Sequence, residues 1–253
     1  MIRRFLIFGM TICLVSALPA PAGIQLEHLV GAWLFDDGKG DVVTDASGNG
    51  HDGEIIGPSW VDEGPFNSAL EFHGAEDVVN VEHSDDLSLQ MFTLMAWVKT
   101  SGSGQAIIHK QPSSDMRNYI LNIYSTTFLR ASFSSAGVRS DCDGTTAVND
   151  DQWHHVAATY DQETLKVYVD GELDGEISSP NKVLENNQEP LRIGHAGGTG
   201  GYRYVGLMDE VAIYNIALSE NEIRFCMEKG LTEVLAVAPV FKLTTLWSKI
   251  KSD

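Results

Sequence analysis

The stretch WHHVAATYDQETLKVYVDG, residues 153–171, places two short alternating segments on either side of a polar turn. Alternation of apolar and polar side chains with a period of two is typical of β-strands. We therefore predict strands over 153–160 and 165–169. Asp170-Gly171 directly follows the second segment, and an Asp-Gly pair in this place is a strong signal for a tight hairpin turn. The stretch thus predicts a pair of antiparallel strands.

The same pattern continues on both sides of this hairpin. Further strands are predicted at 29–35, 69–72, 78–81, 92–99, 106–109, 119–124, 129–133, 191–194 and 207–214. Helix signals are confined to the end of the chain, where Ser219 and Glu222 form a capping box and Gly230 is expected to end the helix. Many short strands with almost no helix favour an all-β sandwich of two antiparallel sheets with one short C-terminal helix.

The first residues are typical of a targeting segment. Arg3 and Arg4 precede an apolar run over 5–18, which is too short to span a bilayer. Residues 20–22 are Ala-Pro-Ala, so we expect residues 1–22 to be a cleaved signal peptide and the protein to be secreted, extracellular or at the cell surface. An uncleaved N-terminal anchor is the alternative. The folded domain is then expected over 23–230, with a tail over 231–253 that packs on the sandwich, binds a partner or is disordered.

Charge restricts the partners. The chain carries 17 basic and 35 acidic residues, a formal net charge of −18. Such a surface repels nucleic acid and anionic membranes. We therefore expect no nucleic-acid partner. No membrane span is expected either, because the apolar run over 5–18 is too short for one.

Several motifs, taken in their order along the chain, resemble a known family. They are Gly31-Ala32-Trp33-Leu34-Phe35-Asp36, the segment 45–53 (DASGNGHDG), the strands over 92–99 and 153–160, and Leu191-Arg192-Ile193-Gly194 followed by 206–215 (GLMDEVAIYN). Over roughly residues 28–230 the chain resembles the bacterial laminin-G-like/pentraxin-like domains of the concanavalin A-like lectin/glucanase superfamily. The resemblance implies a jelly-roll sandwich and a role in binding glycans or in adhesion.

Three functions follow from this reading. The first is a secreted, non-enzymatic module that binds carbohydrate or glycoprotein, with a structural calcium ion. The second is a structural or adhesion protein that contacts other proteins without binding sugar. The third is a glycan-active enzyme, which needs paired carboxylates. No catalytic residue is predicted, because the glucanase spacing Glu-x-Asp-x-x-Glu is absent and the neighbours Asp209 and Glu210 should point to opposite faces of a strand.

The calcium prediction combines a local pattern with the resemblance. Asp45, Ser47, Asn49 and Gly50 match the opening of a calcium loop, but its twelfth position is Ile56 rather than Glu. The resemblance implies an ion joining the N-terminal loop to the final strand, with ligands Asp45, Asn49 and Asp209 and further candidates Asp36 and Asp77. The alternative is a solvated turn, which Asp, Asn and Gly also favour.

A glycine-rich loop over 195–204 ends in Tyr202, Arg203 and Tyr204, which we predict to contact the ligand through aromatic and cationic groups. The alternative is an ordinary loop whose tyrosines pack on the sheet. Trp33, Trp97 and Trp153 lie within alternating strands and are expected in the core.

The mature chain contains two cysteines, Cys142 and Cys226. A secreted chain with two cysteines permits one disulfide, and two buried thiols are the alternative.

Overall fold

The fold is a sandwich of two antiparallel sheets. The computed structural model describes residues 24–74, 76–112, 116–124, 127–197 and 201–237. Within these residues each sheet has eight strands. Across sheet A the order is β14 (Glu172–Ser178), β13 (Thr164–Val169), β12 (Trp153–Tyr160), β7 (Phe92–Lys99), β16 (Val205–Tyr214), β5 (Ala69–His73) and β4 (Ser59–Val61), with β1 (Leu29–Trp33) also on β16. Across sheet B it is β11 (Val138–Ala147), β10 (Phe128–Ser135), β9 (Tyr119–Ile123), β8 (Gln105–Lys110), β15 (Leu191–Ile193), β6 (Val78–Val81), β3 (Gly53–Ile56) and β2 (Val42–Val43).

The predicted central hairpin is confirmed. β12 pairs with β13 from Val156 opposite Val169 to Tyr160 opposite Leu165, and β12 pairs along its full length with β7. Asp170 and Gly171 have φ values of 51° and 78°, the left-handed conformation that the two central residues of a type I′ turn require. This turn leads directly into β14, which extends the sheet by one further strand.

The main core lies between the two sheets and contains the inward side chains of both. Trp33 is fully buried there, and its indole Nε1 donates a hydrogen bond of 2.8 Å to the carbonyl of His51. Trp97 and Trp153 are only half-buried, so the core interpretation holds for Trp33 alone. Trp97 instead packs edge-on against Phe66 and His155 on the other face of sheet A.

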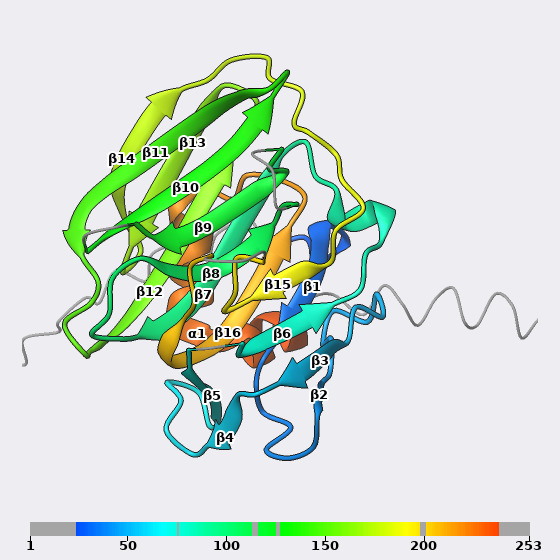
Figure 1. Ribbon diagram of the computed structural model, residues 1–253, viewed down its shortest axis with the longest axis vertical. Helices are drawn as coiled ribbons and strands as arrows, with labels where there is room; N and C mark the ends of the chain where they lie inside the picture. Colours follow the sequence, from blue (N-terminus) through cyan, green and yellow to red (C-terminus); the bar gives the residue numbers. More distant parts are fainter. Residues whose placement is uncertain (1–23, 75, 113–115, 125–126, 198–200, 238–253) are drawn as a thin grey trace, which may run out of the picture.

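One α-helix, α1 (Glu220–Val237), covers the outer face of sheet A and lies behind it in Figure 1. The predicted capping box is confirmed, because the Ser219 hydroxyl and backbone amide both donate to the Glu222 carboxylate, at 2.7 and 2.8 Å. Gly230 breaks the helix with a φ of 70°, but a helical segment resumes beyond it. Leu231 and Val234 are buried against sheet A, so the described fold extends past residue 230. The remaining expected tail, 238–253, lies outside the described residues, as do residues 1–23.

Two 3-10 helices, η1 (Leu26–His28) and η2 (Asp85–Leu87), complete the regular structure of the described chain. None of the helices in the described ranges is long and apolar enough to cross a membrane.

The predicted disulfide is absent. Cys142 on β11 belongs to the core between the sheets, whereas Cys226 on α1 belongs to the cluster on the outer face of sheet A. Both are buried free thiols, because sheet A separates the two clusters. Of the two alternatives, the disulfide is contradicted and the two buried thiols are found; the sequence left both open because sequence separation carries no information on which side of a sheet each cysteine lies.

A bulge in β16 places two acids together. β16 pairs with β5 through 205–208 and then with β1 through 211–214, so Asp209 and Glu210 lie where its partner changes. Its register with β7 shifts at the same point, and Glu210 has a φ of 53°. The expectation that these neighbours point to opposite faces is therefore wrong, because the bulge interrupts the alternation of the strand.

Candidate functional site: a polar pocket on the outer face of sheet B

The outer face of sheet B carries polar side chains because its strands alternate. On β9, Leu121 and Ile123 face the core, so Asn122 faces outward. On β10, Leu129 and Ala131 face the core, and Arg130 between them faces outward. This alternation produces a polar surface over a fully apolar interior.

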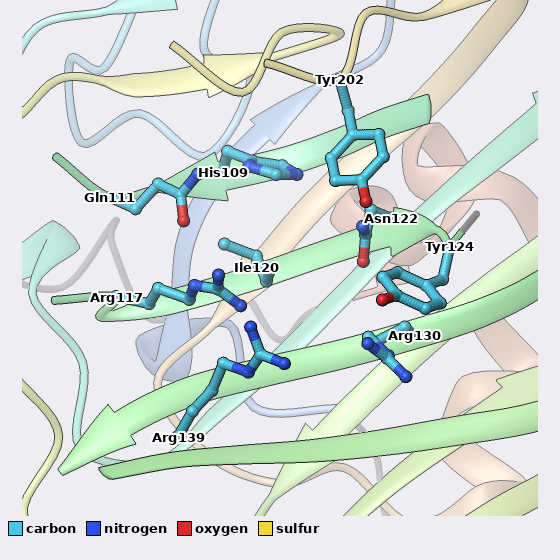
Figure 2. A pocket seen from close by; sticks show the side chains of 9 residues that line it. All are labelled: His109, Gln111, Arg117, Ile120, Asn122, Tyr124, Arg130, Arg139 and Tyr202. Carbon is cyan, nitrogen blue, oxygen red and sulfur yellow. The ribbon is translucent and has the colours of Figure 1, made fainter. Parts of the chain in front are cut away.

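A pocket of about 120 Å³ opens on this face. We call it the sheet B pocket, and Figure 2 shows the side chains that line it. They come from β8 to β11 and the adjoining loops, and they are His109, Gln111, Arg117, Ile120, Asn122, Tyr124, Arg130, Arg139 and Tyr202. In the view of Figure 2 the two tyrosines border one end of the pocket, and Arg117 and Arg139 border the other.

Two buried side chains in the pocket have polar atoms without partners among the described residues. Both ring nitrogens of His109 and the Oδ1 atom of Asn122 lack a hydrogen-bond partner, although each side chain is only 1% exposed. Burial, reinforced by the positive charge of Arg117, lowers the pKa of His109 to about 3. The ring is therefore neutral at pH 7 and offers one donor and one acceptor. Because unpaired buried polar groups cost free energy, these atoms point to a missing ligand or ordered water.

The three arginines of the pocket lie close to two aspartates outside its described lining. Arg130 makes a two-pronged contact with Asp143, which raises the pKa of its guanidinium. Arg139 Nη2 lies 2.7 Å from Asp141 Oδ2. The same Asp141 carboxylate lies 3.8 Å from Arg130 and 4.0 Å from Arg117, so one carboxylate faces three guanidinium groups.

The aromatic end is built from Tyr124 and Tyr202. Their rings meet edge-on with centroids 6.5 Å apart, and the guanidinium carbon of Arg130 lies 3.4 Å from the centroid of the Tyr124 ring. Tyr202 is held by a small hairpin, in which His195 pairs with Arg203 and the Ala196 amide donates to the Tyr202 carbonyl. A stacked cation and two rings form the mixed apolar and polar surface that suits an amphipathic ligand.

Of the three residues predicted to contact the ligand, the structure brings only Tyr202 into the pocket. Arg203 forms an ion pair of 2.9 Å with Glu76 and is not among the described lining residues. Tyr204 is fully buried, packs on Phe72 and donates to the Leu207 carbonyl. The prediction for Tyr204 was wrong, because its ring lies in the core between the two sheets, where no ligand reaches it.

Two of the predicted calcium ligands, Asp45 and Asn49, serve instead as structural hydrogen-bonding groups. Both Asp45 oxygens already accept hydrogen bonds, from the backbone amides of Ala32, Ser47 and His51 and from the Ser47 hydroxyl. The Asn49 amide group donates to the carbonyls of Leu29 and Val30. These residues form the Asx turn that was the alternative interpretation, and they fasten the loop to β1.

Asp77 is also engaged elsewhere. Its Oδ2 atom accepts from the His73 backbone amide at 2.7 Å and contacts the His73 ring. Within the described ranges no three histidine, cysteine or carboxylate side chains are arranged to hold a metal ion.

Asp209 and Asp36 do share one region, together with Glu210. Burial raises the pKa of Asp209 to about 8, and the charges of Glu210 and Asp36 add to this effect. Burial likewise raises the pKa of Glu210 to about 7. Glu210 Oε2 accepts from the Leu231 amide, whereas Oε1 is buried without a partner in the described chain. Neither acid lines the sheet B pocket.

A laminin-G family model, described as "Concanavalin A-like lectin/glucanases superfamily", matches residues 73–224, which is more than half of the chain. The chain belongs to this superfamily. The two-sheet architecture described above agrees with the concanavalin A-like assignment, and the predicted fold class is confirmed.

The chain is similar to known proteins in sequence and in structure. Pappalysin-1 of Mus musculus is 25% identical over 211 residues, covering 74% of this chain but only 12% of pappalysin-1. The binding domain of Paraclostridial Mosquitocidal Protein 1 has a TM-score of 0.66 at 18% identity, covering 79% of this chain and 52% of that one. Domain 4 of AbnA, a GH43 extracellular arabinanase from Geobacillus stearothermophilus, has a TM-score of 0.61 at 19% identity. The match covers 78% of this chain and 97% of the AbnA domain. This concanavalin A-like chain therefore has the fold of known binding domains.

Proposed function

We propose that the chain is a non-catalytic module that recognises carbohydrate, free or on a glycoprotein, through the sheet B pocket. The observation that carries this proposal is a pair of buried polar side chains in the pocket, neutral His109 and Asn122, whose ring nitrogens and Oδ1 atom have no hydrogen-bond partner among the described residues. A sugar hydroxyl both donates and accepts, so it matches a neutral imidazole beside an amide oxygen. The tyrosines at the other end offer the apolar surface against which a sugar ring packs.

The size of the pocket also bears on the ligand. Its volume of about 120 Å³ is well below the roughly 300–1,000 Å³ of a typical small-molecule site. It therefore accommodates one sugar ring or its substituent rather than a long oligosaccharide. The structure of the similar AbnA domain is described in complex with arabinotriose, which supports a sugar ligand for this fold.

The arrangement of acids supports a binding role over catalysis. A retaining glycosidase holds two carboxyl groups about 5 Å apart beside its substrate. The side chains described as lining the pocket include no carboxylate, and the nearby Asp143 and Asp141 are paired with arginines. Asp209 and Glu210 are not among the described lining residues of this pocket either.

A glycan array tests this function. The full chain should bind at least one glycan, and Asn122→Ala and Tyr202→Ala should each weaken that binding roughly tenfold, as expected for a lost hydrogen bond or ring contact. Asn186→Ala, an exposed asparagine outside the pocket, is the matched control and should bind normally. Glycan binding that is unchanged in both pocket variants would disprove the site. Absence of any glycan binding would favour the protein-adhesion alternative.

We also propose that a structural calcium ion binds at Asp209 and Glu210, with Asp36 close by. Calcium takes six to eight oxygen ligands, and Glu210 Oε1 is a buried oxygen without a partner in the described chain. Gly64 lies against this region, since a Cβ atom there would be 2.7 Å from Asp209 Oδ2 and 2.2 Å from the Ser68 carbonyl oxygen. Because no three acidic side chains are ready to ligate one ion, backbone carbonyls or a shift of Asp36 must complete the site.

Thermal melting in calcium and in chelator tests the ion. A site with a Kd near ~0.1 mM at roughly 2 mM free calcium stabilises the fold by about 1.8 kcal/mol. Asp209→Asn should remove the calcium-dependent gain, and Asp161→Asn in the central hairpin should keep it. Identical melting curves for the unmodified chain in both conditions would exclude the ion.

Export of the chain is proposed from the pattern of residues 1–22. N-terminal sequencing of the secreted protein should give Gly23 as the first residue, and a start at Met1 would contradict the proposal.

A further inference from the structure

His154, at the start of β12, lies between two aspartates. Its Nδ1 atom is 2.8 Å from Asp170 Oδ2, and its Nε2 atom is 3.1 Å from Asp150 Oδ1. Asp150 belongs to the connection between β11 and β12, and Asp170 opens the turn between β13 and β14. The histidine side chain is only 15% exposed, whereas both aspartates are partly exposed. One imidazole ring therefore joins two loops at this end of sheet A.

The two contacts together require a charged ring. An ionised carboxylate only accepts hydrogen bonds, and a neutral imidazole has one N–H group and one lone pair. A neutral His154 could donate to one aspartate but would turn its lone pair towards the other. The imidazolium form has an N–H group on each nitrogen, so it satisfies Asp150 and Asp170 at the same time.

Electrostatics agree with this geometry. Burial lowers the pKa of His154, but the hydrogen bonds and charges of Asp170 and Asp150 outweigh it and raise the pKa above its usual value. The adjacent His155 behaves differently, because burial lowers its pKa to about 4 and the charge of Asp170 opposes this only in part. Of the two neighbouring histidines, only His154 is therefore held in its charged form.

The other charged groups beside the turn are paired with one another. Arg224 on α1 forms ion pairs of 2.7 Å with Glu172 and 3.0 Å with Glu220, and it donates to the Gly171 carbonyl. On the other side of β12, β7 presents the uncharged Val98 opposite His154. The pKa of His154 responds to the two aspartates and not to the groups on α1.

We propose that His154 is a pH-sensitive clasp, which in its protonated form ties the β11–β12 connection to the β13–β14 turn and which opens when the ring loses its proton. Asp150 should be released, because its contact is the longer of the two. Since the pKa of His154 is raised in the fold, the clasp stabilises the chain fully below the usual histidine value of about 6.5 and is lost as the pH rises through the folded value.

The protonation state of the ring can be measured directly by NMR on the full ¹⁵N-labelled chain. At pH 6, long-range ¹H–¹⁵N spectra should show both ring nitrogens of His154 protonated and only one of those of His155. In denaturant the His154 ring should titrate near about 6.5, and in the folded chain it should titrate at a higher pH. A folded pKa at or below the denatured value would overturn the proposal.

Asparagine variants identify which carboxylate holds the proton. Asp170→Asn should lower the pKa of His154 more than Asp150→Asn, because its contact is shorter, and asparagine followed by glycine keeps the type I′ turn. With both replaced, burial acts alone and His154 should titrate below its denatured value. Asp161→Asn, which removes a carboxylate bonded to amides of its own turn, is the matched control and should leave the pKa of His154 unchanged. The same absence of change in both single clasp variants would contradict the clasp.

Hydrogen exchange shows whether the proton controls the loop. The Asp151 amide donates to the Thr100 carbonyl at 2.9 Å and reports on the β11–β12 connection. Its protection, corrected for the intrinsic pH dependence of exchange, should fall several-fold as the pH passes the midpoint of the His154 titration. The Ala46 amide in the N-terminal segment is the control and should not follow this midpoint. If His154 titrates as expected while the protection of Asp151 stays constant, the ring is charged but is no switch, and the proposal fails.

Discussion

Asp45 illustrates how a single residue takes a structural role in place of a metal-binding one. Burial raises the pKa of its carboxyl group, but hydrogen bonds from Ser47, Ala32 and His51 outweigh that effect and hold the pKa below its usual value. The charged form is therefore stabilised by the fold. Because its four hydrogen bonds connect β1 to the following loop, Asp45 acts as a fixed part of the N-terminal segment.

We predict that Asp45→Asn lowers the free energy of unfolding by about 2–4 kcal/mol, since one amide group replaces an oxygen that accepts two hydrogen bonds. Chemical denaturation should give the same loss in calcium and in chelator. Asp161→Asn, which removes an exposed carboxylate from a turn, is the control and should cost little. A decrease in the free energy of unfolding that is seen only in calcium would instead show that Asp45 is a metal ligand.

The two acids at the β16 bulge, Asp209 and Glu210, should make the fold less stable as the pH rises. This is the opposite of the effect of Asp45, whose pKa the fold lowers. Their pKa values are raised in the folded state, so between about pH 4 and 8 the folded chain binds more protons than the unfolded chain. In chelator, stability should therefore be highest near pH 4 to 5 from these groups and should fall as the pH rises towards 8.

Asp209→Asn should remove much of this decline, because an asparagine stays neutral across the range. Relative to the unmodified chain, we expect the variant to gain on the order of 1–3 kcal/mol at pH 8 and almost nothing near pH 4. Chemical denaturation in chelator at several pH values measures this difference. A difference that does not change with pH would show that Asp209 is already ionised in the fold.

At the scale of elements, the packing of β1 depends on a glycine beside a tryptophan. A Cβ atom on Gly31 would lie 2.5 Å from the six-membered ring of the Trp33 indole. The indole is fixed in the core by the hydrogen bond from its Nε1 to the His51 carbonyl. The Trp33 side chain therefore packs over position 31 of the same strand, and only glycine leaves room for it there.

Gly31→Ala should destabilise the fold by about 1–3 kcal/mol through overpacking and lower the melting temperature by several degrees. The same change in a Trp33→Phe background should cost much less, because phenylalanine lacks the outer ring atoms that the new methyl group meets. A double-mutant cycle measures this coupling. Additive effects of the two substitutions would contradict the packing explanation.

Strands with one face in the core could be predicted from sequence, and others could not. β7, β12 and β13 place every second side chain in the core between the sheets, so their sequences show a period of two. β11 and β14 are mostly exposed edge strands that contain Gly144 and Gly175, and β2 to β4 have only two to four residues each. Pairing with neighbours, rather than side-chain pattern, makes these five segments strands.

At the scale of the whole molecule, the sequence predicted the fold and one lining residue, Tyr202. The rest of the pocket comes from four strands and two loops that the chain brings together only when the sheet forms. A weak signal existed in the outward positions of β9 and β10, where Asn122 and Arg130 interrupt apolar strands. Their convergence on His109 depends on strand order, which local patterns do not encode.

The central claim is that the outer face of sheet B holds the ligand, and mapping of backbone amide chemical shifts tests it most directly. The full chain is titrated with the glycan that binds most tightly in the array, while the amide spectrum is recorded. The account predicts that shifts concentrate at β8 to β10, near Asn122, and at Tyr202. Shifts concentrated instead in the N-terminal loop over 36–52, with the β9 amides unchanged, would contradict it.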